Sequence, residues 1–151
     1  MEPRMKHPAF VLPETQSAVN GLVKVINSTD VPESTLELVH MRASQINGCA
    51  ACVDFGVQKA KKNGESDERL HSVAVWRESP LFTEAERAAL ALTESATRIA
   101  DRPDSVSDEV WDAAAGNFNE EQLSAILLMI GMTNLANRLN VPIRLPAGQA
   151  L

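Results

Sequence analysis

Apolar residues recur at helical spacing along nearly the whole of this sequence, in segments separated by proline, glycine and helix-capping residues. The Asn-Gly pairs at 47–48 and 63–64 are typical helix ends, because glycine adopts the left-handed conformation that often follows a last helical turn. Thr83 and Glu86 have the spacing of a capping box at a helix start. No stretch alternates apolar and polar residues in the manner of a strand. We therefore predict an all-α, single-domain bundle of about seven helices, at 14–26, 33–46, 49–62, 66–76, 84–100, a short segment after Ser107, and 119–139.

Composition narrows the functions that this chain can have. Of its 151 residues, 44% are hydrophobic and 23% are charged, an ordinary globular balance, and we expect residues 1–151 to form one domain. The 20 acidic and 14 basic residues give a net charge of −6, which argues against a nucleic-acid partner, because such binders carry a basic face. No run approaches the ~18 apolar residues of a membrane span. The apolar run at 9–12 is shorter than the core of a signal peptide, so we expect a cytoplasmic protein with no membrane partner.

Cys49 and Cys52 are the only cysteines, and they directly follow the predicted helix end at 47–48. Residues three apart share one face of a helix, so the two sulfur atoms can meet. The N-terminus of a helix offers unpaired N–H groups and a partial positive charge, and both favour a thiolate over a thiol. This placement favours a pair that cycles between dithiol and disulfide.

Two other interpretations of the cysteines remain open. They could be buried structural thiols, since free cysteine is among the most buried residue types. They could also bind zinc, but a structural zinc site needs about four ligands, and His7, His40 and His71 are scattered along the chain. We therefore expect no metal and no cofactor.

The residues around the pair carry a family resemblance. Its most specific part is the string Ser-Gln-Ile-Asn-Gly-Cys-Ala-Ala-Cys at 44–52, with Glu37 twelve residues before the first cysteine. This pattern resembles the alkyl hydroperoxidase D type (AhpD-like) core of the carboxymuconolactone decarboxylase superfamily. The resemblance spans about 33–139 and continues at 62–65, 69–70, 76–83, 86–91 and 134–139.

The resemblance implies an AhpD-like helical fold that assembles into homo-oligomers and reduces peroxide, or another small oxidant, through the cysteine pair. In that scheme Cys52 attacks the peroxide as the nucleophile, while Cys49 donates a proton and then closes the disulfide. Glu37 belongs to the proton relay, and an external dithiol reductant restores the pair. The predicted helix at 123–139 is apolar nearly all round, which also favours a homo-oligomer.

Position 56 departs from the family pattern, which has a histidine four residues after the second cysteine where this chain has Gly56. Loss of a general base slows proton transfer by about 10²–10⁴-fold, so we expect weakened peroxidase activity. The helices at 33–46 and 49–62 should form a short hairpin that places residue 56 level with 39 and 40. His40 shares a helix face with Glu37 and could therefore fill the space beside Gly56 as a substitute catalytic residue. The alternative is a solvated histidine on the helix surface.

Two other functions remain open for a chain of this fold. It could be a dithiol sensor or disulfide reductase, with Gly56 marking a lost peroxidase relay. It could also be a helical scaffold with an inert cysteine pair. Thiol reactivity and peroxide consumption distinguish these functions from the peroxidase.

Overall fold

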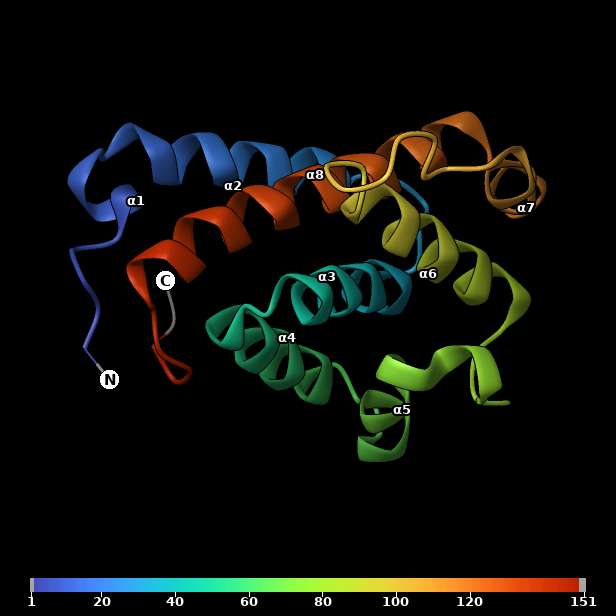
Figure 1. Ribbon diagram of the computed structural model, residues 1–151, viewed down its shortest axis with the longest axis horizontal. Helices are drawn as coiled ribbons and strands as arrows, with labels where there is room; N and C mark the ends of the chain where they lie inside the picture. The colour runs from blue at the N-terminus through green and yellow to red at the C-terminus, as the bar shows by residue number, and fades with distance from the viewer. Residues whose placement is uncertain (1, 150–151) are drawn as a thin grey trace.

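The centre of the molecule is α3 (Glu33–Asn47), which packs against α4, α6 and α8. The computed structural model describes residues 2–149, and every regular element within them is a helix (Figure 1). The predicted all-α class is confirmed, with eight α-helices and one 3₁₀-helix among these residues where about seven helices were expected. The other elements are α1 (Pro8–Val11), α2 (Glu14–Ile26), α4 (Ala50–Lys62), α5 (Asp67–Ser72), the 3₁₀-helix η1 (Val73–Glu78), α6 (Glu84–Thr97), α7 (Asp108–Asn117) and α8 (Glu120–Ile143).

Two apolar clusters meet on α3. Leu36 and Val39 belong to the first, which lies between α2, α6, α7 and α8, while Leu38 and Met41 belong to the second, against α4, α5 and η1. Fully burying one large aliphatic side chain contributes roughly 1.5–3 kcal/mol, so both clusters hold α3 strongly. The side chains of α3 therefore occupy fixed positions beside α4 and α8.

The segment after Ser66 differs from its prediction as a single α-helix at 66–76. The α-helix ends at Ser72, and the chain continues as the tighter 3₁₀-helix η1. This winding turns Trp76 inward, where its indole Nε1 donates a hydrogen bond to Glu94 of α6 at 2.9 Å. The contact between Trp76 and Glu94 thus outweighs the local pattern that predicts one continuous α-helix at 66–76.

Both ends of the chain depart from the sequence-based expectation. The short helix α1 was not predicted. The last helix continues to Ile143, beyond the expected end near 139, and includes Pro142. Arg4 supplies donors to this last turn: its backbone N–H bonds the Ile143 carbonyl at 2.8 Å, and its Nη1 bonds the Pro142 carbonyl at 3.1 Å. In contrast, α6 ends at Thr97, short of the expected 100.

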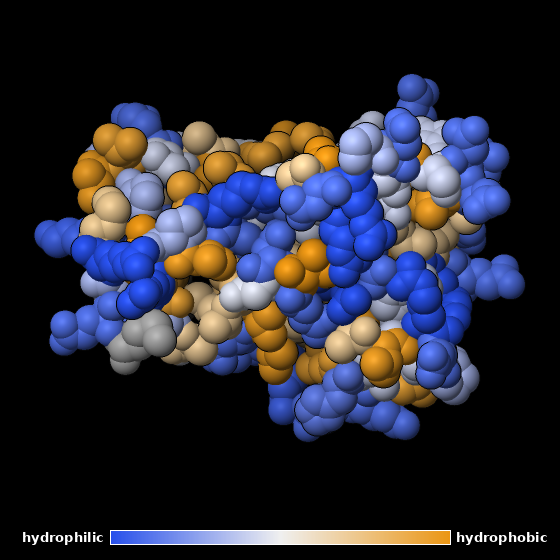
Figure 2. Space-filling view, in the orientation of Figure 1, coloured by the Kyte–Doolittle hydropathy of each residue, from blue (hydrophilic) through white to orange (hydrophobic). Residues whose placement is uncertain are grey.

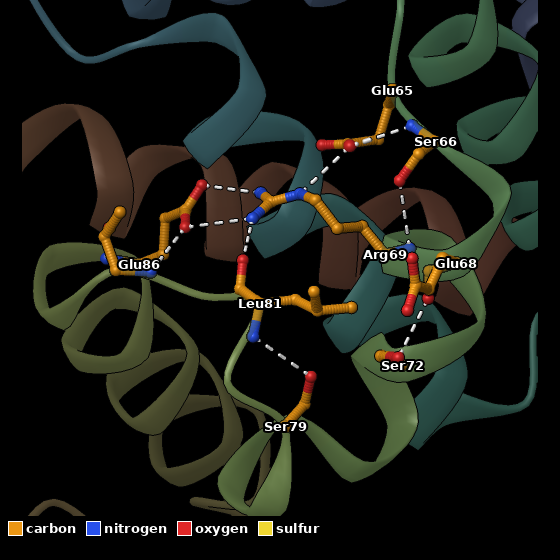
Figure 3. A network of polar contacts seen from close by, with 9 residues as sticks. Glu65, Ser66, Glu68, Arg69, Ser72, Ser79, Leu81 and Glu86 are labelled. Carbon is orange, nitrogen blue, oxygen red and sulfur yellow. Dashed lines mark hydrogen bonds and ion pairs between the residues drawn. The ribbon is translucent and has the colours of Figure 1, made fainter.

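Arg69 joins α5 to the start of α6 (Figure 3). Its guanidinium donates to Glu86 at 2.7 Å, to Glu65 at 2.9 Å and to the Leu81 carbonyl. Glu86 also accepts the Thr83 N–H at 2.8 Å, which completes the predicted capping box. The network therefore fixes the first turn of α6, the helix that faces α3.

The surface carries apolar side chains as well as charged ones. Figure 2 shows an apolar group over α1, where Phe10, Val11 and Leu12 are exposed. Within residues 2–149, the helices are too short or too polar to cross a membrane.

Candidate functional site

The turn between α3 and α4 positions the cysteine pair. Gly48 ends α3 in the left-handed conformation, with a φ of 66°. The Cys49 N–H then donates to the Ser44 carbonyl at 3.0 Å, which closes the last turn of α3. Cys49 becomes the N-cap of α4, as its predicted place at a helix start requires.

Cys49 and Cys52 form a disulfide, with 5.3 Å between their Cα atoms. Both are buried, with exposed fractions of 1% and 5%. The Cys49 sulfur also accepts the Cys52 N–H at 3.4 Å, one of the orphan donors at the N-terminus of α4. The predicted proximity of the two sulfur atoms is confirmed, and the pair lies where helix geometry favours a thiolate.

A cavity of about 510 Å³ lies between α2, α3, α4 and α8. Of the two cysteines, Cys52 lines this cavity and Cys49 does not. Its walls are largely apolar, and its polar side chains include His40, Thr133 and Asn140 together with Glu37 and Lys59. Its apolar walls include Val19, Val23, Leu36, Phe55, Met129 and Leu139.

His40 lies in this cavity against the backbone of α4. Its Nε2 is 3.1 Å from the Cys52 carbonyl oxygen, so Nε2 carries the proton that this acceptor requires. Its Nδ1 lies 3.4 Å from the Thr133 hydroxyl. Burial lowers the pKa of His40, the bond to the Cys52 carbonyl partly offsets this, and the charge of Lys59 lowers the pKa further. The interpretation of His40 as a solvated surface histidine is therefore wrong, because the side chain packs between α3, α4 and α8.

Gly56 is what makes room for this imidazole. A Cβ atom at position 56 would lie 3.0 Å from His40 Cδ2 and 3.2 Å from Met41 Cε. The expected register, with residue 56 level with His40 across the hairpin, is confirmed. Gly56 therefore leaves α4 without a side chain at this level and admits the imidazole of His40 from α3.

Glu37 lies one turn before His40 and also lines the cavity. Its Oε1 accepts a hydrogen bond from Asn63 Nδ2 at 2.6 Å, and Lys59 Nζ lies 3.5 Å from the same oxygen. Both of these partners belong to the C-terminal end of α4. The three predicted site residues Cys52, His40 and Glu37 thus share one cavity, with Glu37 anchored toward the far end of α4.

Sequence reasoning missed Asn140 and Thr133, which both come from α8. Asn140 Nδ2 donates to the Cys52 sulfur at 3.3 Å, and Thr133 faces His40. Thr133 falls inside the predicted last helix, where a polar residue interrupts an apolar pattern, but Asn140 falls one residue beyond its predicted end at 139. Another amide of this helix, Asn137, accepts a bond from Asn47 at 2.8 Å and so ties α8 to the end of α3.

A profile of the carboxymuconolactone decarboxylase family matches residues 13–95, more than half of the chain and the whole of the α3–α4 hairpin. The chain belongs to this family. Its similarity to YdfG of Bacillus subtilis, an uncharacterised protein, is 31% identity over 131 residues, covering 87% of this chain and 88% of the relative. The family membership that the AhpD-like resemblance implied is therefore confirmed.

Solved structures extend the comparison to the fold. A protein of unknown function from Agrobacterium tumefaciens, provisionally assigned to AhpD antioxidant defence, is 33% identical. It superposes with a TM-score of 0.89, covering 99% of this chain and 100% of that one. The debrominase Bmp8, as a cysteine-to-alanine variant in complex with 2,3,4-tribromopyrrole, has a TM-score of 0.78 at 24% identity, covering 88% of this chain and 70% of that chain, which shows a shared fold.

Proposed function

We propose that this protein is a thiol-dependent oxidoreductase that reduces an alkyl hydroperoxide, with Cys52 as the nucleophile and Cys49 as the resolving cysteine. The observation that carries the proposal is that Cys52 lines the cavity while Cys49, its disulfide partner, does not. A substrate in the cavity would reach Cys52 first. The largely apolar walls suit an organic hydroperoxide, whose carbon chain is removed from water on binding.

The proposed reaction balances as follows. The Cys52 thiolate attacks the terminal hydroxyl oxygen of the hydroperoxide, the O–O bond breaks, and the alkoxide takes the Cys49 proton to leave as an alcohol. Cys52 is oxidised to a sulfenic acid and the peroxide oxygen is reduced. The Cys49 thiolate then attacks the Cys52 sulfur, and the hydroxide that leaves takes up the proton that Cys52 first lost, giving water. An external dithiol reduces the disulfide by thiol–disulfide exchange.

His40 is the proposed acceptor of the Cys52 proton. It is held beside Cys52, and burial favours the neutral imidazole, which can accept a proton. Its Nε2 is committed to the Cys52 carbonyl, so the lone pair on Nδ1, beside Thr133, is the basic site. We assign Glu37 to the same relay as a carboxylate within the cavity. In this proposal the chain acts as a homo-oligomer of single domains in the cytoplasm.

Hydroperoxide consumption by the reduced protein tests the proposal, with tert-butyl hydroperoxide as substrate and dithiothreitol as the dithiol. Cys52→Ser should abolish consumption. Reduced Cys49→Ser, freed of dithiothreitol before the assay, should consume one equivalent of hydroperoxide and stop with Cys52 as a sulfenic acid. His40→Ala should slow the reaction about tenfold or more. His71→Ala, at an exposed histidine of α5, is the matched control and should leave the rate unchanged.

Two outcomes would contradict the proposal. If Cys52→Ser consumes hydroperoxide as fast as the wild type, the nucleophile is wrong. If the wild type has reactive thiols yet consumes no hydroperoxide, the dithiol serves a sensor or disulfide reductase instead.

A further inference from the structure

Asn140 lies on α8, and its side-chain amide contacts the sulfur of Cys52 beside the cavity. Only 4% of the residue is exposed, yet it is among the residues that line the cavity. Its Nδ2 donates to the Cys52 sulfur at 3.3 Å. Its Oδ1 is buried, and no protein group among residues 2–149 donates to it.

This arrangement is unusual for a buried amide. Leaving a buried acceptor without a donor is unfavourable, and the large majority of such atoms in folded proteins have a partner. A leucine of similar size would avoid that cost. The free Oδ1 therefore points to a ligand in the cavity that brings its own donor.

The donor half of the amide has a separate consequence for the sulfur. A thiolate is a much stronger acceptor than a disulfide sulfur, so the Nδ2 contact strengthens when Cys52 is reduced. The Cys49 sulfur has its own donor, the Cys52 N–H at 3.4 Å. The two sulfur atoms are thus served by different groups, one from the backbone of α4 and one from the side chain of Asn140.

We propose that Asn140 is a catalytic residue that holds both reactants: its Nδ2 stabilises the Cys52 thiolate, and its Oδ1 accepts the O–H of the hydroperoxide. The second half rests on the proposed function. The hydroxyl oxygen held in this way is the one that forms the S–O bond, and its hydrogen stays on it in the sulfenic acid. Because Nδ2 and Oδ1 belong to one planar amide, they would hold the Cys52 sulfur and the terminal oxygen of the hydroperoxide close together.

The thiolate half is tested in the reduced Cys49→Ser protein, which has a single thiol. The probe is methyl methanethiosulfonate, a thiol reagent that has no hydrogen-bond donor, and its reaction rate is measured against pH. Asn140→Leu should move the profile to higher pH and slow the reaction about tenfold at neutral pH, since charge-assisted hydrogen bonds contribute strongly. Asn140→Asp should move it further, because a carboxylate beside the sulfur opposes the thiolate.

Asn137→Leu is the matched control, because Asn137 is a buried amide of the same helix that bonds Asn47 and Ser44 and does not line the cavity. It should lower thermal stability without moving the pH profile. If both Asn140 variants keep the wild-type profile while folded by circular dichroism, the assignment is overturned.

The substrate half is tested with tert-butyl hydroperoxide on the same single-thiol proteins. Asn140→Leu should slow the hydroperoxide reaction about tenfold more than the reaction with methyl methanethiosulfonate, because only the hydroperoxide uses Oδ1. Equal slowing of both reactions would refute the role of Oδ1. A wild type that shows the expected pH profile but no hydroperoxide reaction would refute the proposed function and would still support the thiolate contact.

Discussion

Replacing Gly56 by alanine should reveal how tightly His40 packs on α4. Gly→Ala in the middle of a helix normally stabilises a protein by about 1 kcal/mol. Here the added Cβ would meet His40 Cδ2 at 3.0 Å and Met41 Cε at 3.2 Å, both closer than ordinary van der Waals contacts. Overpacking of this kind costs about 1–3 kcal/mol. We therefore expect Gly56→Ala to destabilise by about 0–2 kcal/mol, and the melting temperature to fall by up to several degrees.

Removal of the imidazole should reverse the sign of this effect. In a His40→Ala background the closest contact is gone, so Gly56→Ala should stabilise by about 1 kcal/mol, as helix propensity alone requires. Urea unfolding of the four oxidised proteins in this cycle gives the coupling energy, which we expect to be about 1–3 kcal/mol. Gly21→Ala is the control, because a Cβ at this helical glycine meets nothing within 4 Å. If Gly56→Ala stabilises equally with and without His40, the two residues are not packed together and the placement of His40 is refuted.

Oxidation, assembly and acid sensitivity can each be checked. Mild peroxide treatment should remove one pair of hydrogen atoms by intact mass, because Cys49 and Cys52 are disulfide partners; persistent free thiols would contradict this. Light scattering should give a multiple of the 16.4 kDa chain mass. Leu128→Glu, on the half-exposed face of α8, should shift this mass toward that of the monomer. A wild type that is monomeric at micromolar concentration would contradict the prediction of a homo-oligomer. The free energy of unfolding, measured with urea, should fall as the pH drops from about 7 to about 4, because the unfolded chain binds protons at higher pH than the folded chain. Burial raises the pKa of Glu94, but hydrogen bonds from Trp76, Arg77 and Arg42 outweigh burial and lower this pKa overall. Burial also lowers the pKa of His40 below its usual 6.5. A urea midpoint that does not change with pH would refute this reasoning.

The parts of the fold that the sequence predicts well are those with local causes. Gly48 ends α3 in a left-handed turn, and Thr83 caps α6 through Glu86, because these devices act within a few residues. The register that brings residue 56 to His40 also follows from the sequence, since a short turn fixes the pairing of the two helices. The position of the cysteine pair at a helix start is therefore predictable.

The features that the sequence does not predict depend on contacts between distant segments. The α-helix after Ser66 gives way to a 3₁₀-helix where Trp76 reaches Glu94, eighteen positions along the chain. Pro142 remains inside α8 where Arg4 supplies donors from the other end of the chain. Periodicity and propensity within one segment contain no information about such partners.

Asn140 illustrates the same limit at the candidate site. It follows directly after the predicted end of the last helix, and the sequence gives no reason to connect it with a cysteine eighty-eight positions earlier. The α3–α4 hairpin places Cys52, His40 and Gly56 together by local geometry, whereas the wall of the cavity that α8 supplies comes from a segment far along the chain. The resemblance places a relay histidine after the second cysteine, but here the imidazole beside Cys52 comes from α3, and both Thr133 beside it and Asn140 on the sulfur come from α8. In the proposed mechanism, proton transfer at Cys52 depends on how α8 docks on the hairpin, so variants that loosen that docking should slow the reaction of Cys52 with hydroperoxide even when α3 and α4 are unchanged.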